Sequence, residues 1–177
     1  MPYQNPQKWV QRTQAHIVVS LQYRLNFFGN PNGPFANGTQ NLGFFDVRLA
    51  MEWTRDNIAA FGGDPSRMVL WGQSAGAGMT GQQSLAYIDD PIVTGYIQDS
   101  GATYGVFPGY TDTTYSNFTF LAHRFGCTGT DANLTACLRE VPQADLESYI
   151  QYSVDAGVSP ALKIGRASCR ERVLPIV

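Results

Sequence analysis

Residues 68–87 read Met-Val-Leu-Trp-Gly-Gln-Ser-Ala-Gly-Ala-Gly-Met-Thr-Gly-Gln-Gln-Ser-Leu-Ala-Tyr, and this stretch decides the fold. Met68–Trp71 is apolar throughout, which is typical of a short buried strand. Gly72–Gly76 predicts a sharp turn, and Ala77–Tyr87 is compatible with a helix despite its two glycines. The stretch therefore predicts a strand that bends abruptly into a helix.

The flanking sequence extends this pattern in both directions. Upstream, Ile17–Tyr23 is short, β-branched and apolar, which predicts a buried strand, and Asn26–Gln40 is rich in Gly, Pro and Asn, which predicts a loop. Leu42–Ala60 predicts a helix, which ends where Phe61–Pro65 supplies glycine and proline. Downstream, Tyr96–Gln98 begins a third strand. Strands that alternate with helices in this order predict an α/β fold with a mostly parallel sheet covered by helices.

The apolar residues of the predicted helix 42–60 recur at three- and four-residue steps. One stripe is formed by Leu42, Phe45, Leu49 and Trp53, and it is widened by Phe44, Val47, Met51 and Ile58. An apolar surface this wide predicts a helix that is buried on more than one side.

The predicted turn carries the pattern G-x-S-x-G, as Gly72-Gln73-Ser74-Ala75-Gly76. The pattern alone is weak, but a strand before it and a helix after it are the context of a nucleophile elbow; the alternative is an ordinary glycine-rich turn. In an elbow, Ser74 takes a strained left-handed backbone conformation, and Gly72 and Gly76 avoid the clash that Cβ atoms would make. The N–H of Ala75 then helps to hold an oxyanion.

Longer blocks around the elbow resemble the type-B carboxylesterases, the cholinesterase-like branch of the α/β-hydrolase fold. The serine signature of that family matches Phe61–Gly76. Further matching blocks follow one another along the chain: Tyr23-Arg24-Leu25, Phe28-Gly29, Asn41-Leu42-Gly43 with Asp46, Arg48-Leu49-Ala50, Trp53, Asp56–Ala60 and Asp99-Ser100-Gly101. Gln73 departs from the common Glu, as in secreted fungal-type members, and Val47 departs from the usual Gln; neither change disturbs the elbow.

The resemblance implies part of an α/β-hydrolase fold, with a central, mostly parallel sheet and helices on both faces. It also implies that Ser74 attacks small-molecule or lipid carboxylic esters through an acyl-enzyme, without a cofactor. Only Ser74 and Ala75 match functional positions, because the family's triad acid, histidine and upstream oxyanion loop have no counterpart in this sequence. We therefore expect the 177-residue chain by itself to be nearly inactive. The alternatives are a non-catalytic cholinesterase-like adhesion module, which commonly loses the nucleophile, and, more remotely, a serine peptidase.

A catalytic triad within this chain is an alternative, because Ser74, Asp99 and His123 follow one another in the family's order of serine, acid and histidine. His123 lies in an amphipathic helical pattern, however, and Asp99 lies in a block where the family does not place its acid. We therefore interpret His123 as a partly exposed helix residue, and His16, just before a predicted strand, as structural.

Several features favour a secreted protein, although the sequence contains no secretion signal. In the type-B esterases a short disulfide loop occupies this region, so the resemblance implies a bridge between Cys127 and Cys137; two free thiols are the alternative, and no metal site is expected. Three glycosylation sequons begin at Asn37, Asn117 and Asn133. Together these features favour an oxidising, secretory route.

The end of the chain departs from this pattern. After the third strand, Tyr115–Phe125 and Asp145–Tyr152 predict helices of an insertion rather than of the sheet. Ile164–Val173 resembles the translation of a common sequencing-adapter oligonucleotide, and the last 15 residues hold four of the 12 basic residues. We therefore expect a partial α/β-hydrolase domain at 1–162 and a non-native tail at 163–177; a solvated basic tail is the alternative.

Composition excludes several other classes of protein. Hydrophobic residues make up 44% of the 177 residues, which is enough to form a core and argues against disorder. The net charge of −2 offers no basic excess for binding nucleic acid, and the apolar runs are far shorter than the roughly 18 residues of a membrane span.

Overall fold

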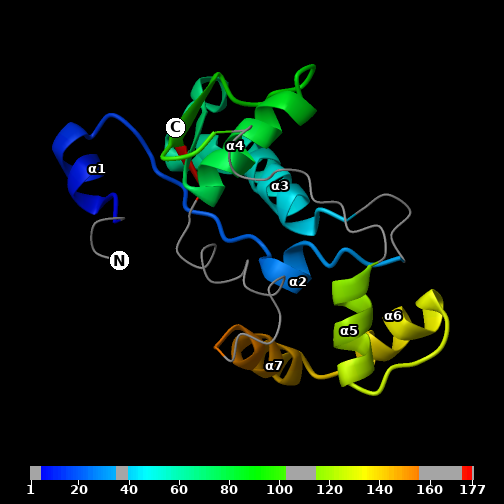
Figure 1. The fold of residues 1–177 in the computed structure, drawn as a ribbon. Coiled ribbons are helices and arrows are strands. Elements are labelled where there is room, and N and C mark those ends of the chain that lie inside the picture. The colour runs from blue at the N-terminus through cyan, green and yellow to red at the C-terminus, as the bar shows by residue number, and fades with distance from the viewer. Residues whose placement is uncertain (1–4, 35–39, 103–114, 156–172, 177) are drawn as a thin grey trace. The chain divides into compact units, whose positions relative to one another are not determined.

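The computed structural model describes residues 5–34, 40–102, 115–155 and 173–176 (Figure 1). Two compact units divide the chain. In the described residues, the first unit comprises 5–23, 44–102 and 173–176, and the second comprises 24–34, 40–43 and 115–155. Among these residues, no helix is both long and apolar enough to cross a membrane.

The first unit is built on a three-stranded sheet in the order β2-β1-β3. β1 and β2 are parallel, with Val69 opposite Gly95 and Gln73 opposite Asp99, whereas β3 is antiparallel to β1. Its elements along the chain are α1 (Gln7–Thr13), α3 (Leu42–Asn57), the 3-10 turns η2 (Ile58–Phe61) and η3 (Pro65–Arg67), β1 (Val69–Gln73), α4 (Ala75–Ala86), β2 (Gly95–Asp99) and β3 (Val173–Ile176). This arrangement confirms the helices predicted at 42–60 and 77–87, the strand predicted at 68–71 and the strand predicted to begin at Tyr96.

The predicted turn is shorter than expected. The strand continues through Gln73 and the helix begins at Ala75, so the whole change of direction takes place at Ser74.

The predicted strand Ile17–Tyr23 is wrong for this structure. No strand is formed over these residues, and only Val18 forms a single bridge. A strand requires a partner with free backbone groups along its edge. Here both edges of β1 are occupied, one by β2 and the other by β3, which lies within the tail 163–177.

The core of the first unit lies between α3 and the sheet, and it corrects the predicted stripe. Its buried members are Leu21, Val47, Met51, Met68, Leu70 and Val93. On α3 the buried side is therefore that of Val47 and Met51, whereas Phe45, Leu49 and Trp53 are 42%, 64% and 51% exposed. The prediction that this helix is buried on more than one side is wrong here, because a small sheet covers only one side of it.

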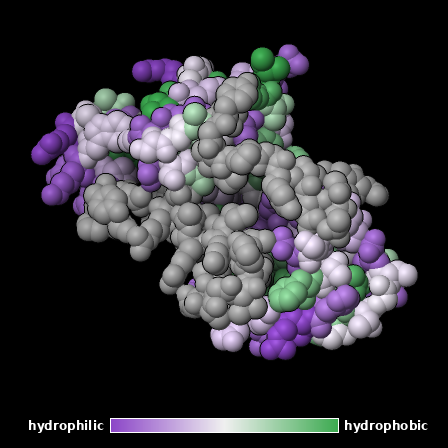
Figure 2. Space-filling view, viewed as in Figure 1, coloured by the Kyte–Doolittle hydropathy of each residue, from purple (hydrophilic) through white to green (hydrophobic). Residues whose placement is uncertain are grey.

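The second unit consists of helices: α2 (Asn26–Gly29), α5 (Ser116–Arg124), α6 (Asp131–Glu140) and α7 (Gln143–Asp155). The helices predicted at 115–125 and 145–152 are confirmed, whereas α6 was not predicted, and α2 is one turn inside the predicted loop. The core of this unit consists of Phe118, Leu121, Ala122, Cys127, Leu134, Leu138 and Leu146. Among the described residues, the face of the molecule seen in Figure 2 mixes hydrophilic and hydrophobic residues. A disulfide joins Cys127 to Cys137, as the resemblance implied, with 5.6 Å between their Cα atoms.

Candidate active site

Ser74 is the single residue that joins β1 to α4. Its backbone angles are φ 57° and ψ −118°. The positive φ was predicted, but ψ lies far from the left-handed helical region, so the conformation is more strained than expected. Its side chain is half-buried and makes no capping hydrogen bond to the start of α4. The hydroxyl is therefore not consumed in stabilising the helix that it precedes.

Gly72 is required because β1 and the first turn of α4 approach very closely. A Cβ built on Gly72 would lie 2.1 Å from the carbonyl oxygen of Gly76 and 2.6 Å from Oγ1 of Thr80. Real Cβ atoms do not approach backbone at such distances, so any larger residue would force the strand and helix apart. This close approach supports the steric role predicted for Gly72, while the same role for Gly76, which is buried in the first turn of α4, stays a prediction.

Gly101, which lies outside the G-x-S-x-G pattern, also packs against the elbow, and this role was not predicted. A Cβ on Gly101 would lie 2.6 Å from the carbonyl oxygen of Ser74 and 2.9 Å from Cβ of Ala77. The only sequence signal for this contact was a glycine three residues after the predicted strand segment Tyr96–Gln98, within a block that matches the family.

The carboxyl end of β2 holds the elbow in place through hydrogen bonds. The N–H of Ser74 donates to the carbonyl of Asp99, the last residue of β2, at 2.8 Å. The first turn of α4 adds a bond from the N–H of Gly78 to the carbonyl of Ser74 at 3.1 Å. The side-chain amide of Gln98 donates to the carbonyl of Ala77 at 3.1 Å. The strained residue therefore sits at the carboxyl end of two parallel strands, the edge at which open α/β sheets bind ligands.

The start of α4 provides backbone donors at the same place. Ala75 is the first residue of this 12-residue helix, and the first N–H groups of a helix have no partner within it. Small residues dominate the buried side of α4, which includes Gly76, Ala77, Gly78, Thr80 and Gly81. The N–H of Ala75, at the positive end of the helix dipole, is suited to stabilise an oxyanion formed at Ser74.

Asp99 and His123 show no sign of acting as a triad with Ser74. A carboxylate oxygen of Asp99 accepts a hydrogen bond from Nε1 of Trp71 at 2.6 Å. His123 is exposed in the last turn of α5, in the second unit. Each residue thus has the ordinary structural setting that its sequence context suggested.

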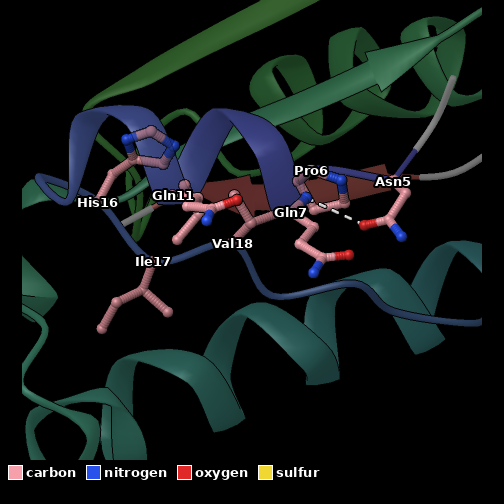
Figure 3. Close-up of a pocket in the computed structure, with 8 residues that line it drawn as sticks. Asn5, Pro6, Gln7, Gln11, His16, Ile17 and Val18 are labelled. Carbon is pink, nitrogen blue, oxygen red and sulfur yellow. Dashed lines mark hydrogen bonds between the residues drawn. The ribbon is translucent and has the colours of Figure 1, made fainter.

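His16 also has structural contacts. Its Nδ1 pairs with Oγ1 of Thr13 at 2.9 Å, and its ring centroid lies 4.1 Å from that of Trp9. Figure 3 shows His16 beside α1. There it lines a depression of about 480 Å³ together with seven other residues, all between positions 5 and 18. Ser74 is not among the lining residues.

The sequons and possible metal ligands complete the survey of sites. Asn37 lies outside the described residues. Asn117 and Asn133 lie in the first turns of α5 and α6, and Asn133 is exposed. In the part of the chain that the structure describes, no group of three or more His, Cys, Asp or Glu side chains could hold a metal ion.

Comparison with known proteins gives consistent results. Residues 4–168 match the family model described as "Carboxylesterase family". The chain is 44% identical over 162 residues to secreted lipase 5 of Gibberella zeae and 47% identical over 161 residues to chlorogenic acid esterase of Aspergillus niger; each match covers 89% of this chain and 30% of the relative. Secreted lipase 1 of Botryotinia fuckeliana is 36% identical over 150 residues, or 78% of this chain and 26% of the relative. The chain thus spans about a third or less of the length of these relatives.

Proposed function

Because this chain belongs to the carboxylesterase family, we propose that it carries the nucleophile of an enzyme that hydrolyses carboxylic esters, and that this nucleophile is Ser74. The observation that carries the proposal is the backbone of Ser74, whose φ of 57° and ψ of −118° are maintained between a strand and a helix. Such strain persists where the surrounding structure enforces it, and it concentrates at functional sites.

The chemistry follows from the groups around Ser74. Its hydroxyl oxygen attacks the ester carbonyl carbon while a histidine takes the hydroxyl proton. The carbonyl oxygen becomes an oxyanion, to which the N–H of Ala75 donates. The tetrahedral intermediate then collapses to an acyl-enzyme, and the alcohol leaves with the proton from the histidine. Water, deprotonated in turn, releases the acid and restores Ser74.

The histidine and the acid of the triad are proposed to come from outside this chain. Its two histidines, His16 and His123, have the structural settings described above. We therefore expect the 177-residue chain by itself to hydrolyse esters at most slightly faster than water does.

The relatives suggest the class of substrate and the location. Two of them are named lipases and one chlorogenic acid esterase, so small-molecule or lipid carboxylic esters are the proposed substrates. The names "secreted lipase 5" and "secreted lipase 1" support secretion of this protein, as does the disulfide, because disulfides persist in oxidising compartments. We propose Asn117 and Asn133 as glycosylation sites on the same basis.

A chimera tests this function directly. The segment of Aspergillus niger chlorogenic acid esterase that matches this chain is replaced by the corresponding residues of this chain, so that the relative provides the remainder of the protein. We expect hydrolysis of an aryl ester, and a loss of about 10⁴-fold or more in kcat on Ser74→Ala. A folded chimera without activity would favour a non-catalytic adhesion module instead, and a chimera that stays fully active after Ser74→Ala would show that Ser74 is not the nucleophile.

A further inference from the structure

A depression on the second unit has a lining that the proposed hydrolysis does not use. Its volume is about 490 Å³, within the usual size range of small-molecule sites. Its lining consists of Arg124, Phe125, Asp145, Ser148, Tyr149 and Tyr152. These residues come from the end of α5 and from α7.

One side of α7 provides most of this lining. Asp145, Ser148, Tyr149 and Tyr152 are spaced by three, one and three residues, so they project from the same side of the helix. Leu146 and Ile150, only 6% and 5% exposed, occupy the opposite side and face the core. The lining side of α7 is therefore available to solvent in the described unit.

Aromatic rings form one wall of the depression. The rings of Phe125 and Tyr149 meet edge to face with centroids 5.7 Å apart, and the Tyr152 ring follows at 6.4 Å from that of Tyr149. Tyr152 is 61% exposed, so much of its ring faces water. The wall ends in an accessible aromatic surface that a flat, weakly polar ligand could cover.

Two side chains of opposite charge, Arg124 and Asp145, lie beside this wall and do not form an ion pair with each other. The guanidinium carbon of Arg124 lies 5.2 Å above the Tyr149 ring, and Asp145 is exposed in the first turn of α7. Among the described residues, no ion pair joins Arg124 to Asp145 or to any other carboxylate. The helix dipole favours a cation such as Arg124 in the last turn of α5 and an anion such as Asp145 in the first turn of α7. It does not explain why both side chains lie beside an exposed aromatic ring.

We propose that this depression binds a neutral saccharide, independently of Ser74. A sugar ring offers a flat C–H surface to Tyr152, and its hydroxyl groups both donate and accept hydrogen bonds. Asp145 accepts and Arg124 donates, while Ser148 does both. A charged ligand would meet one like and one opposite charge in this lining, whereas an uncharged ligand with both donors and acceptors can form hydrogen bonds with Arg124 and with Asp145.

Titration of the ¹⁵N-labelled chain with cellohexaose or xylohexaose, followed by NMR, tests the proposal. We expect the amide signals of residues 145–152 and 124–125 to shift with at least one of these probes. Tyr152→Ala should weaken the affinity about tenfold, whereas Tyr152→Phe, which keeps the ring, should stay within about twofold. Phe120→Ala is the matched control, because Phe120 is an exposed aromatic residue of the same unit outside the depression.

Three results would overturn the proposal. The first is the absence of shifts at α7 with both neutral probes while the spectrum of the folded chain is otherwise normal. The second is equal weakening by Tyr152→Ala and Phe120→Ala. The third is binding of trigalacturonic acid in preference to both neutral probes, which would make the site one for anions.

Discussion

The elbow of the first unit and the helices of the second unit are stabilised by different kinds of contact. At the elbow, a strained Ser74 is held by backbone hydrogen bonds and by two glycines, Gly72 and Gly101, that leave no room for a Cβ. The helices α5, α6 and α7 are held by apolar side chains and by the bridge from Cys127 to Cys137.

This difference decides what each region tolerates. Where backbone packs on backbone, even an added methyl group does not fit, because backbone atoms cannot move aside as a side chain can by changing its rotamer. Where side chains pack on side chains, substitutions of similar volume are accommodated. The elbow should therefore depend on the identity of individual residues, and the helical unit on total apolar volume and on its covalent link.

The largest expected effect is at the elbow itself. Gly72→Ala should lower the free energy of unfolding of the first unit by about 3 kcal/mol, the upper end for an added methyl group, because its Cβ would lie 2.1 Å from backbone. Unfolding in urea can be followed by tryptophan fluorescence, since Trp9, Trp53 and Trp71 all belong to this unit.

Gly95→Ala is the control for that substitution. The atom nearest to a Cβ at position 95 would be a methyl carbon of Val69 at 3.7 Å, which is an ordinary van der Waals contact. The free energy of unfolding of the first unit should therefore change little. If both variants lose the same stability, close backbone approach is not what makes Gly72 necessary.

The next effect concerns the second unit alone. Replacing Cys127 and Cys137 together by serine removes a bridge across ten residues, which costs about 2.7 kcal/mol in the chain-entropy estimate. Amide hydrogen exchange should accelerate in α5 and α6 while the tryptophan transition stays in place. A matching shift of the tryptophan transition would contradict the separate stabilisation of the two regions.

A smaller effect is expected from removing residues 163–177, the stretch that we propose to be non-native. The deletion takes away β3 and frees one edge of β1, where Ile17–Tyr23 can then pair. The free energy of unfolding of the first unit should change by less than about 1 kcal/mol, because one ladder replaces another. Hydrogen exchange at 17–23 should slow; a large loss of stability without this slowing would show that the tail belongs to the fold.

The smallest effect is expected on the outer side of α3. Leu49 is 64% exposed, so Leu49→Ala should change the free energy of unfolding by less than about 0.5 kcal/mol. Met51, two residues away and 1% exposed, provides the contrast, because Met51→Ala should cost about 2 kcal/mol. Equal losses in denaturant unfolding would mean that both sides of the helix are buried.

These contrasts also explain what sequence could predict. The strand, the bend and the helix around Ser74 are determined by neighbouring residues, and they were predicted within a few positions. Whether Ile17–Tyr23 forms a strand depends on a distant partner, and that prediction was wrong. On α3, apolar residues on adjacent sides gave no indication of which one meets the sheet. The role of Gly101 also arises from a contact 27 residues away, with Ser74.

The most direct test of the account is the site of covalent labelling in the chimera described above. After treatment with a fluorophosphonate probe and proteolysis, mass spectrometry should locate the label on Ser74, and Ser74→Ala should abolish both labelling and hydrolysis. An active chimera labelled at another residue, or one that hydrolyses esters while Ser74 remains unlabelled, would contradict the assignment of Ser74 as the nucleophile.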